Sequence, residues 1–135
     1  MATFLTLMNW TDQGIRNIGD SPKRLDAAKS NVANALSFTQ TQDGYLTKIA
    51  KALDRMSELA IMSQDITKSD ADRTLYNQEF NQLSAFVTTS STKDFNGVSL
   101  FSSSSLGVTI DSDGNTFSMS GINLGATTYS TATAS

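Results

Sequence analysis

The stretch LDAAKSNVANALSFTQTQDGYLTKIAKALDRMSELA, residues 25–60, decides the fold, because its apolar residues recur at alternating steps of three and four. This spacing predicts a heptad seam along one long helix, sustained for about five repeats. Only Thr39 and Gln42 are polar at seam positions. A seam of this length cannot bury itself, so it needs another helix or another molecule as a partner. The seam residues are Leu25, Ala28, Val32, Ala35, Thr39, Gln42, Leu46, Ile49, Leu53, Met56 and Ala60.

The helix that carries this seam is expected to run from Pro22 to about Gln64. Ser21 has the residue type of an N-cap, and a proline is favoured at the first helical position. Gly44 lies inside the helix, where glycine costs up to about 1 kcal/mol relative to alanine. A break or a bend at Gly44 is therefore compatible with the sequence.

A second helix is expected within residues 70–92. Ser69 and Asp72 have the spacing of a capping box, in which each residue satisfies a backbone N–H group of the other. This helix is shorter than the first and should fold back antiparallel on it. The side chains expected to pack between the two helices are Leu46, Ile49, Leu53, Met56, Tyr76, Phe80, Leu83 and Val87.

The period of the sequence changes after the second helix. Residues 107–110 and 116–119 alternate at period two, and residues 111–115 between them have the composition of a turn. This pattern predicts a β-hairpin. Residues 2–10 combine Phe, Thr, Leu and Trp and are strand-like. The expected fold class is thus mainly α: a long α-helical hairpin followed by a β-hairpin, with a short N-terminal strand.

The composition excludes several classes of function. The chain has no Cys and no His, so Cys/His zinc sites, thiol nucleophiles and Ser-His-Asp triads are absent. The net charge is −3, and Lys and Arg are scattered, which argues against a nucleic-acid partner. No apolar run is long enough for a membrane span, and the N-terminus lacks the pattern of a cleaved signal peptide.

Two acidic groupings have ordinary structural explanations. The order of residues 111–115, Asp-Ser-Asp-Gly-Asn, is wrong for an EF-hand loop, and a plain hairpin turn explains it. Asp54 and Glu58 lie one helical turn apart among Lys51 and Arg55, which predicts a solvated charged face away from the seam. We expect no catalytic residue, no metal site and no cofactor, and hence no enzyme.

Five short motifs follow one another along the chain: NVANA at 31–35, QTQDG at 40–44, LDRMSELA at 53–60, SDADR at 69–73 and TKDFNGVSL at 92–100. Together they resemble the rod segment in the N-terminal half of bacterial flagellin, with its "QTADG", "LqRmrELA" and "tqFNGvkLl" motifs. The resemblance covers residues 25–126 approximately, and the motifs occur in the order of that family.

The resemblance to flagellin implies a structural subunit of the extracellular filament of the bacterial flagellum, exported without a cleaved signal peptide. It implies other flagellin-like subunits as homo-oligomeric partners and a flagellar export chaperone as a further partner, with no nucleic acid and no membrane. The resemblance also points to a set of residues for packing against neighbouring subunits. They are Arg55, Glu58, Leu59, Leu53, Met56, Phe95, Asn96 and Gly97.

The beginning of the chain departs from the flagellin pattern. Residues 7–18, LMNWTDQGIRNI, and 20–29, DSPKRLDAAK, resemble the opening of the GYD family of small α+β proteins. The chain therefore reads as a join, or chimera, of two families inside one helix. The expected organisation is a GYD-like strand and turn over 1–21, a flagellin-like helical rod plus β-hairpin over 22–126, and a polar tail over 127–135.

Two alternatives to a filament subunit remain at this point. One is a small GYD-like α+β protein that binds a ligand or is associated with stress, and the other is a hook–filament junction protein. Because the terminal helices of the flagellin pattern are not matched, we expect the isolated chain to associate laterally near residues 32–38 rather than to form filaments. Residues 2–10 are expected to dock as a strand on the 107–119 hairpin or on a second chain.

Overall fold

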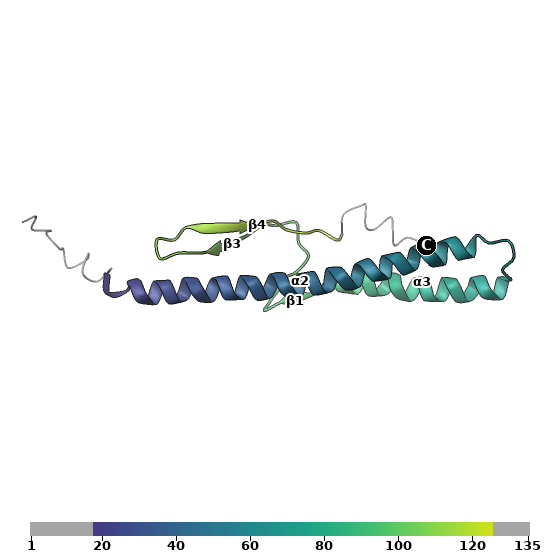
Figure 1. Ribbon diagram of the computed structural model, residues 1–135, viewed down its shortest axis with the longest axis horizontal. Coiled ribbons are helices and arrows are strands. Elements are labelled where there is room, and N and C mark those ends of the chain that lie inside the picture. Colours follow the sequence, from purple (N-terminus) through teal and green to yellow (C-terminus); the bar gives the residue numbers. More distant parts are fainter. Residues whose placement is uncertain (1–17, 126–135) are drawn as a thin grey trace, which may run out of the picture.

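Helix α2, Ser21–Ser63, forms the axis of an elongated molecule in the computed structural model, which describes residues 18–125 (Figure 1). Helix α3, Asp70–Ser91, folds back along the C-terminal part of α2. At about 1.5 Å per residue, α2 is roughly 64 Å long and α3 roughly 33 Å. The N-terminal half of α2 therefore extends beyond the reach of α3. The expected long α-helical hairpin is confirmed.

The ends of the two helices are set by different local interactions. Ser69 accepts a hydrogen bond from the Asp72 backbone, and Asp72 accepts one from the Ser69 backbone, so the expected capping box begins α3. The expected cap of α2 was wrong, because Asp20 and not Ser21 is the N-cap. The backbone N–H of Arg24 already donates to the Asp20 carbonyl oxygen, so the first helical turn starts one residue earlier. Gly44 does not break α2, which is one continuous helix of 43 residues.

The seam of α2 has two positions in each heptad, and only one of them is buried as expected. Gln42, Ile49 and Met56 are buried, as the heptad pattern predicts. At the other heptad position the seam is displaced by one residue in three places, because the residues that precede Thr39, Leu53 and Ala60 are buried. Thr39 and Ala60 are themselves exposed, while Leu46 and Leu53 are half-buried. The buried residues are Phe38, Ala52 and Leu59, whereas Tyr45 is half-buried like Leu46.

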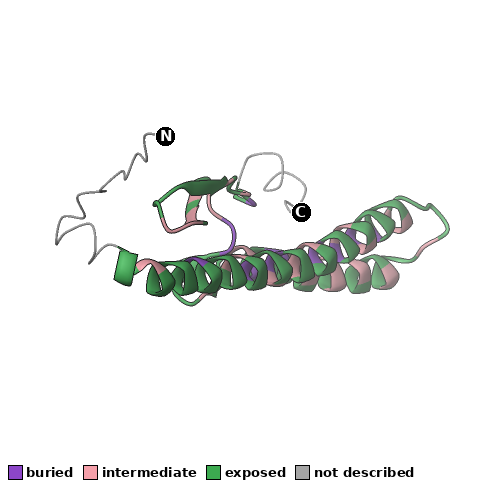
Figure 2. Cartoon of the chain, turned by 60° about the vertical axis from the view of Figure 1, so that its left-hand side comes forward, coloured by how far each residue is buried: buried purple, intermediate pink, exposed green. Residues whose placement is uncertain are grey.

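Aromatic contacts with the segment after α3 hold Phe38 and Tyr45 against the core. The Phe38 ring packs edge-to-face on Phe95, with ring centroids 6.1 Å apart, and Tyr45 packs in the same way on Phe101 at 6.4 Å. Because residues 95–101 return across the middle of α2, the two aromatic positions turn inward. The main core forms where α2, α3 and this segment meet, and Figure 2 shows the buried residues gathered there.

The segment after α3 begins with a tight hairpin. Strand β1, Asp94–Phe95, pairs antiparallel with strand β2, Val98–Ser99. The two residues between the strands, Asn96 and Gly97, have φ angles of 51° and 80°. Two successive positive φ values are the signature of a type I′ turn, for which Asn-Gly is the favoured sequence. This hairpin was not expected, although the Asn-Gly dipeptide signals it.

The second hairpin is confirmed close to its expected bounds. Strand β3, Leu106–Thr109, pairs antiparallel with strand β4, Thr116–Met119. The loop between them is a turn, in which the Asp111 carboxylate accepts hydrogen bonds from the backbone of Asp113 and Asn115. Figure 1 shows this hairpin beside the N-terminal half of α2, with β3 nearer to the helix.

Some expectations fall on residues that the structure does not describe. The strand over residues 2–10 and the polar tail over residues 127–135 lie outside residues 18–125. Within the described residues, neither helix combines the length and the apolarity that crossing a bilayer requires.

Candidate subunit-packing surface

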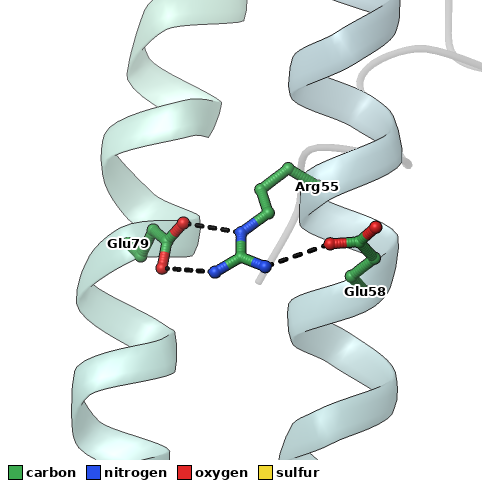
Figure 3. Close-up of polar contacts among 3 residues, drawn as sticks. All are labelled: Arg55, Glu58 and Glu79. Carbon is green, nitrogen blue, oxygen red and sulfur yellow. Dashed lines mark hydrogen bonds and ion pairs between the residues drawn. The ribbon is translucent and has the colours of Figure 1, made fainter.

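Arg55 joins the two helices by a forked ion pair. Its Nε and one terminal nitrogen donate to the two carboxylate oxygens of Glu79 on α3, at 2.7 Å and 3.1 Å. Its other terminal nitrogen donates to Glu58, one turn further along α2, at 3.0 Å. Figure 3 shows the guanidinium between the two carboxylates. Arg55 therefore lies at the boundary between the helices and not on a purely solvated face, which corrects the sequence-based prediction.

The charges in this cluster stabilise one another. The hydrogen bonds from Arg55 hold the pKa of Glu79 below its ordinary value. The hydrogen bonds to Glu79 and then to Glu58 raise the pKa of Arg55. Side-chain exposures are 42% for Arg55, 44% for Glu79 and 64% for Glu58, so solvent reaches the whole cluster. A bidentate arginine–carboxylate pair adds geometric specificity to the helix pairing.

The apolar members of the expected set are divided by burial. Met56 is 2% exposed and Leu59 is 1% exposed, so the chain itself covers both side chains. Leu53 is half-buried and packs against the main core. These three residues hold the helical hairpin together. Of the expected residues on α2, the ones that present surface are Arg55 and Glu58.

Phe95, Asn96 and Gly97 lie about the type I′ turn of the first small hairpin. Phe95 is half-buried against Phe38, whereas Asn96 and Gly97 are exposed at the turn. The structure does not bring these three residues together with the Arg55 cluster, because Phe38 and Arg55 lie more than four helical turns apart on α2. The expected site is thus two separate patches along one rod.

A third patch, which we call the exposed stripe, consists of Ile18, Leu25, Val32 and Leu36. Their exposures are 52%, 47%, 46% and 59%. Three of them belong to α2, where their spacing of seven and four places them along one side of the helix, and Ile18 lies three residues before its first residue. Leu25 and Val32 were expected seam residues, and they are exposed because α3 does not reach this half of α2. Figure 2 shows that half of α2 mostly exposed.

The sequence-based prediction missed two long-range partners. Glu79, which binds Arg55, lies 24 residues away on another helix. The carbonyl oxygen of Leu100, which accepts a hydrogen bond from Gln42, lies 58 residues away. No local pattern signals either pair. Within residues 18–125, no group of three or more His, Cys, Asp or Glu side chains is placed to hold a metal ion.

Comparison with known proteins gives one family. Residues 17–105, about two thirds of the chain, match the bacterial flagellin N-terminal helical region. A flagellar filament 41 kDa core protein of Borreliella burgdorferi is 44% identical over 59 residues, which are 44% of this chain and 18% of that protein. The flagellin of Halalkalibacterium halodurans is 39% identical over 59 residues, which are 44% of this chain and 22% of that protein.

A flagellar filament 31.3 kDa core protein of Treponema maltophilum is 36% identical over 77 residues, which are 56% of this chain and 27% of that protein. The chain thus matches between 18% and 27% of the length of these three relatives. The match of the family to residues 17–105 includes both helices and both strands of the first small hairpin. The chain therefore belongs to the bacterial flagellin N-terminal helical region family.

Proposed function

We propose that this chain is a structural subunit that packs, through its helices, against other flagellin-like subunits in the extracellular filament of a bacterial flagellum. Membership of the flagellin family supports this proposal, as do relatives named flagellin or flagellar filament core protein. The family has a structural and not an enzymatic role, so we propose no catalysis. Neither alternative, a GYD-like ligand-binding protein or a hook–filament junction protein, is favoured by these comparisons.

The observation that carries the proposal is the exposed stripe. An isolated helix gains most of its stability by packing an apolar face, and this half of α2 has no helix beside it in the described chain. Four large aliphatic side chains, each roughly half exposed, make a row along its side. Exposed apolar side chains that gather on one side of a helix suit a surface for another protein. A long helix from a neighbouring subunit has the shape to cover it.

The expected packing residues take two roles in this proposal. Glu58, Asn96, Gly97 and the exposed edge of Arg55 are the contacts for another subunit. Leu53, Met56, Leu59 and Phe95 hold the rod in the shape that presents those contacts. Export without a cleaved signal peptide, with the help of a flagellar export chaperone, remains part of the proposal.

Co-assembly with a relative tests the function. The chain is mixed with monomers of the Halalkalibacterium halodurans flagellin, polymerisation is started, and the filaments are pelleted and viewed by electron microscopy. We expect the chain in the pellet, along the filaments. A Val32→Ser, Leu36→Ser double variant should be depleted from the pellet, because it removes half of the exposed stripe.

Leu75→Ser provides the matched control, because Leu75 is 62% exposed on α3 and lies outside the stripe. It should pellet like the unchanged chain. If the unchanged chain stays in the supernatant while the flagellin polymerises, the proposed role in a filament is wrong.

A further inference from the structure

A groove with a volume of about 370 Å³ lies between α2 and the two small hairpins. Asn34, Ala35 and Phe38 line it on the helix side, and Phe95 and Val98 line it at the first hairpin. The volume falls in the range of roughly 300–1,000 Å³ that ligand sites occupy. None of the residues that line the groove is charged. The groove therefore suits an uncharged, largely apolar occupant.

One wall of this groove is the open edge of a β-strand. All four residues of β3, Leu106–Thr109, line the groove, whereas Met119 alone lines it from β4. Strand β3 pairs with β4 on one edge, and residues 18–125 supply no strand for its other edge. Leu106 of β3 and its partner Met119 of β4 pack the same face of the hairpin against the core, so the other edge of β3 borders the groove beside α2. Unpaired backbone N–H and C=O groups on such an edge accept an extended peptide as a further strand.

We propose that residues 2–10 of the same chain bind in this groove as an extended strand beside β3. This segment, ATFLTLMNW, contains no charged residue and four large apolar or aromatic residues in addition to Met8. In a strand, alternate side chains share a face, so Phe4, Met8 and Trp10 would all point to one side. That side would fill the apolar groove, while the backbone pairs with β3.

The geometry of the chain favours this occupant over others. Asn31, at the edge of the groove, lies about 15 Å along α2 from its first residue, Ser21, at 1.5 Å per residue. The eight residues from Trp10 to Ile18 can span roughly 26 Å when extended, so the segment reaches the groove without a second molecule. The C-terminal tail, residues 126–135, is also uncharged but has Tyr129 as its one large side chain. It offers much less apolar surface.

The proposal is tested in the full chain by the fluorescence of Trp10, which is the only tryptophan. We expect its emission to be blue-shifted and its quenching by acrylamide to be weak. Asn34→Arg places a long charged side chain in the groove and should raise the quenching constant at least threefold. Ala33→Arg is the matched control, because Ala33 is the adjacent exposed residue and does not line the groove. It should leave the quenching unchanged.

Diluting the protein distinguishes a segment bound within its own chain from a segment supplied by a second copy. Binding within one chain predicts weak quenching at every protein concentration. Protection that disappears on dilution would assign the groove to a second copy and overturn the proposal. Equal, strong quenching in the unchanged chain and in Asn34→Arg would also overturn it. Co-assembly with flagellin is a separate readout, so failure of this inference does not depend on the proposed filament role.

A cross-link decides the question if Asn34→Arg lowers helicity by circular dichroism. The chain has no Cys, so Thr6→Cys and Asn31→Cys together introduce the only two thiols. A short bismaleimide should join them within one chain in dilute solution. The pair Thr6→Cys and Ala33→Cys should cross-link much less, because Ala33 lies outside the groove. Absence of a preferential link in the first pair contradicts the proposal.

Discussion

Gln42 Nε2 donates a hydrogen bond of 2.6 Å to the carbonyl oxygen of Leu100. Gln42 occupies a seam position of α2, and Leu100 is 1% exposed in the segment that returns across the helix. The contact therefore satisfies a polar side chain inside the core and attaches the segment after α3 to the middle of α2. A polar residue in an apolar seam, which weakens a coiled coil, here fixes where the chain returns.

Replacing Gln42 should destabilise the folded chain, because its side chain is buried and hydrogen-bonded. Gln42→Ala leaves the Leu100 carbonyl group buried without this partner, and a buried unsatisfied group costs about 1–3 kcal/mol. Gln40→Ala is the matched control, because Gln40 is exposed on the same helix. Urea denaturation should show a lower midpoint for Gln42→Ala alone. Equal midpoints for the two variants would show that the hydrogen bond contributes little.

The position of the seam can be tested by truncating neighbouring leucines. Leu59→Ala should cost about 2–5 kcal/mol of unfolding free energy, as buried leucine truncations do. Leu53→Ala should cost less, because Leu53 is half-buried, whereas Leu59 is 1% exposed. Ile61→Ala, at a position 68% exposed, should change stability by no more than about 0.5 kcal/mol. A larger loss at Leu53 than at Leu59 would restore the seam that the heptad pattern alone predicts.

The Arg55–Glu79 ion pair should make stability depend on acid pH. Hydrogen bonds from Arg55 lower the pKa of Glu79 in the folded chain below its ordinary value of 4.5. A lowered folded-state pKa stabilises the fold at pH values above 4.5, and this stabilisation is lost as the pH falls through the folded-state pKa. Thermal melts should show a lower Tm for Glu79→Gln at pH 7 than for the unchanged chain.

The difference in Tm between these two proteins should shrink as the pH falls below 4.5, because Glu79 takes up its proton there in the unfolded chain and only at lower pH in the folded chain. High salt should also reduce it, because the pair is partly exposed. Glu58→Gln serves for comparison, since Glu58 shares only one hydrogen bond with Arg55. A Tm difference for Glu79→Gln that is the same at pH 7 and in acid would contradict a role for the charge.

Gly97 should be hard to replace although space surrounds it. Its φ angle is 80°, and no heavy atom lies within 4 Å of where a Cβ would be added. Gly97→Ala should therefore cost about 1–2 kcal/mol through backbone strain alone. Gly107→Ala is the control, because Gly107 also has open space around it and needs no positive φ. Denaturation midpoints compare the two, and equal losses would argue against strain at the type I′ turn.

The exposed stripe should promote association of the chain with itself. Light scattering across a concentration series should show growing particle mass for the unchanged chain, because Val32 and Leu36 are 46% and 59% exposed. The Val32→Ser, Leu36→Ser double variant should associate less at every concentration, and Leu75→Ser should behave like the unchanged chain. A strictly monomeric unchanged chain at high concentration would show that the stripe is not a contact surface.

The sequence by itself determined the elements of this fold. The bounds of α2 and α3, the capping box at Ser69 and Asp72, and the β3–β4 hairpin were all predicted within a few residues. Each of these features depends on residues that are near one another in the chain: helical periodicity, alternation at period two, and turn composition. The Asn96–Gly97 hairpin belongs to the same class, since its dipeptide is a local signal for a type I′ turn.

Only the tertiary structure decided which side of α2 faces the core and where Arg55 binds. The heptad pattern allows two adjacent registers, and the returning rings of Phe95 and Phe101 favour the one that contains Phe38 and Tyr45. Arg55 meets Glu79 because α3 folds back beside α2, a contact between residues 24 positions apart. The reason is physical: periodicity reports which side chains are apolar, but burial depends on what later folds against them.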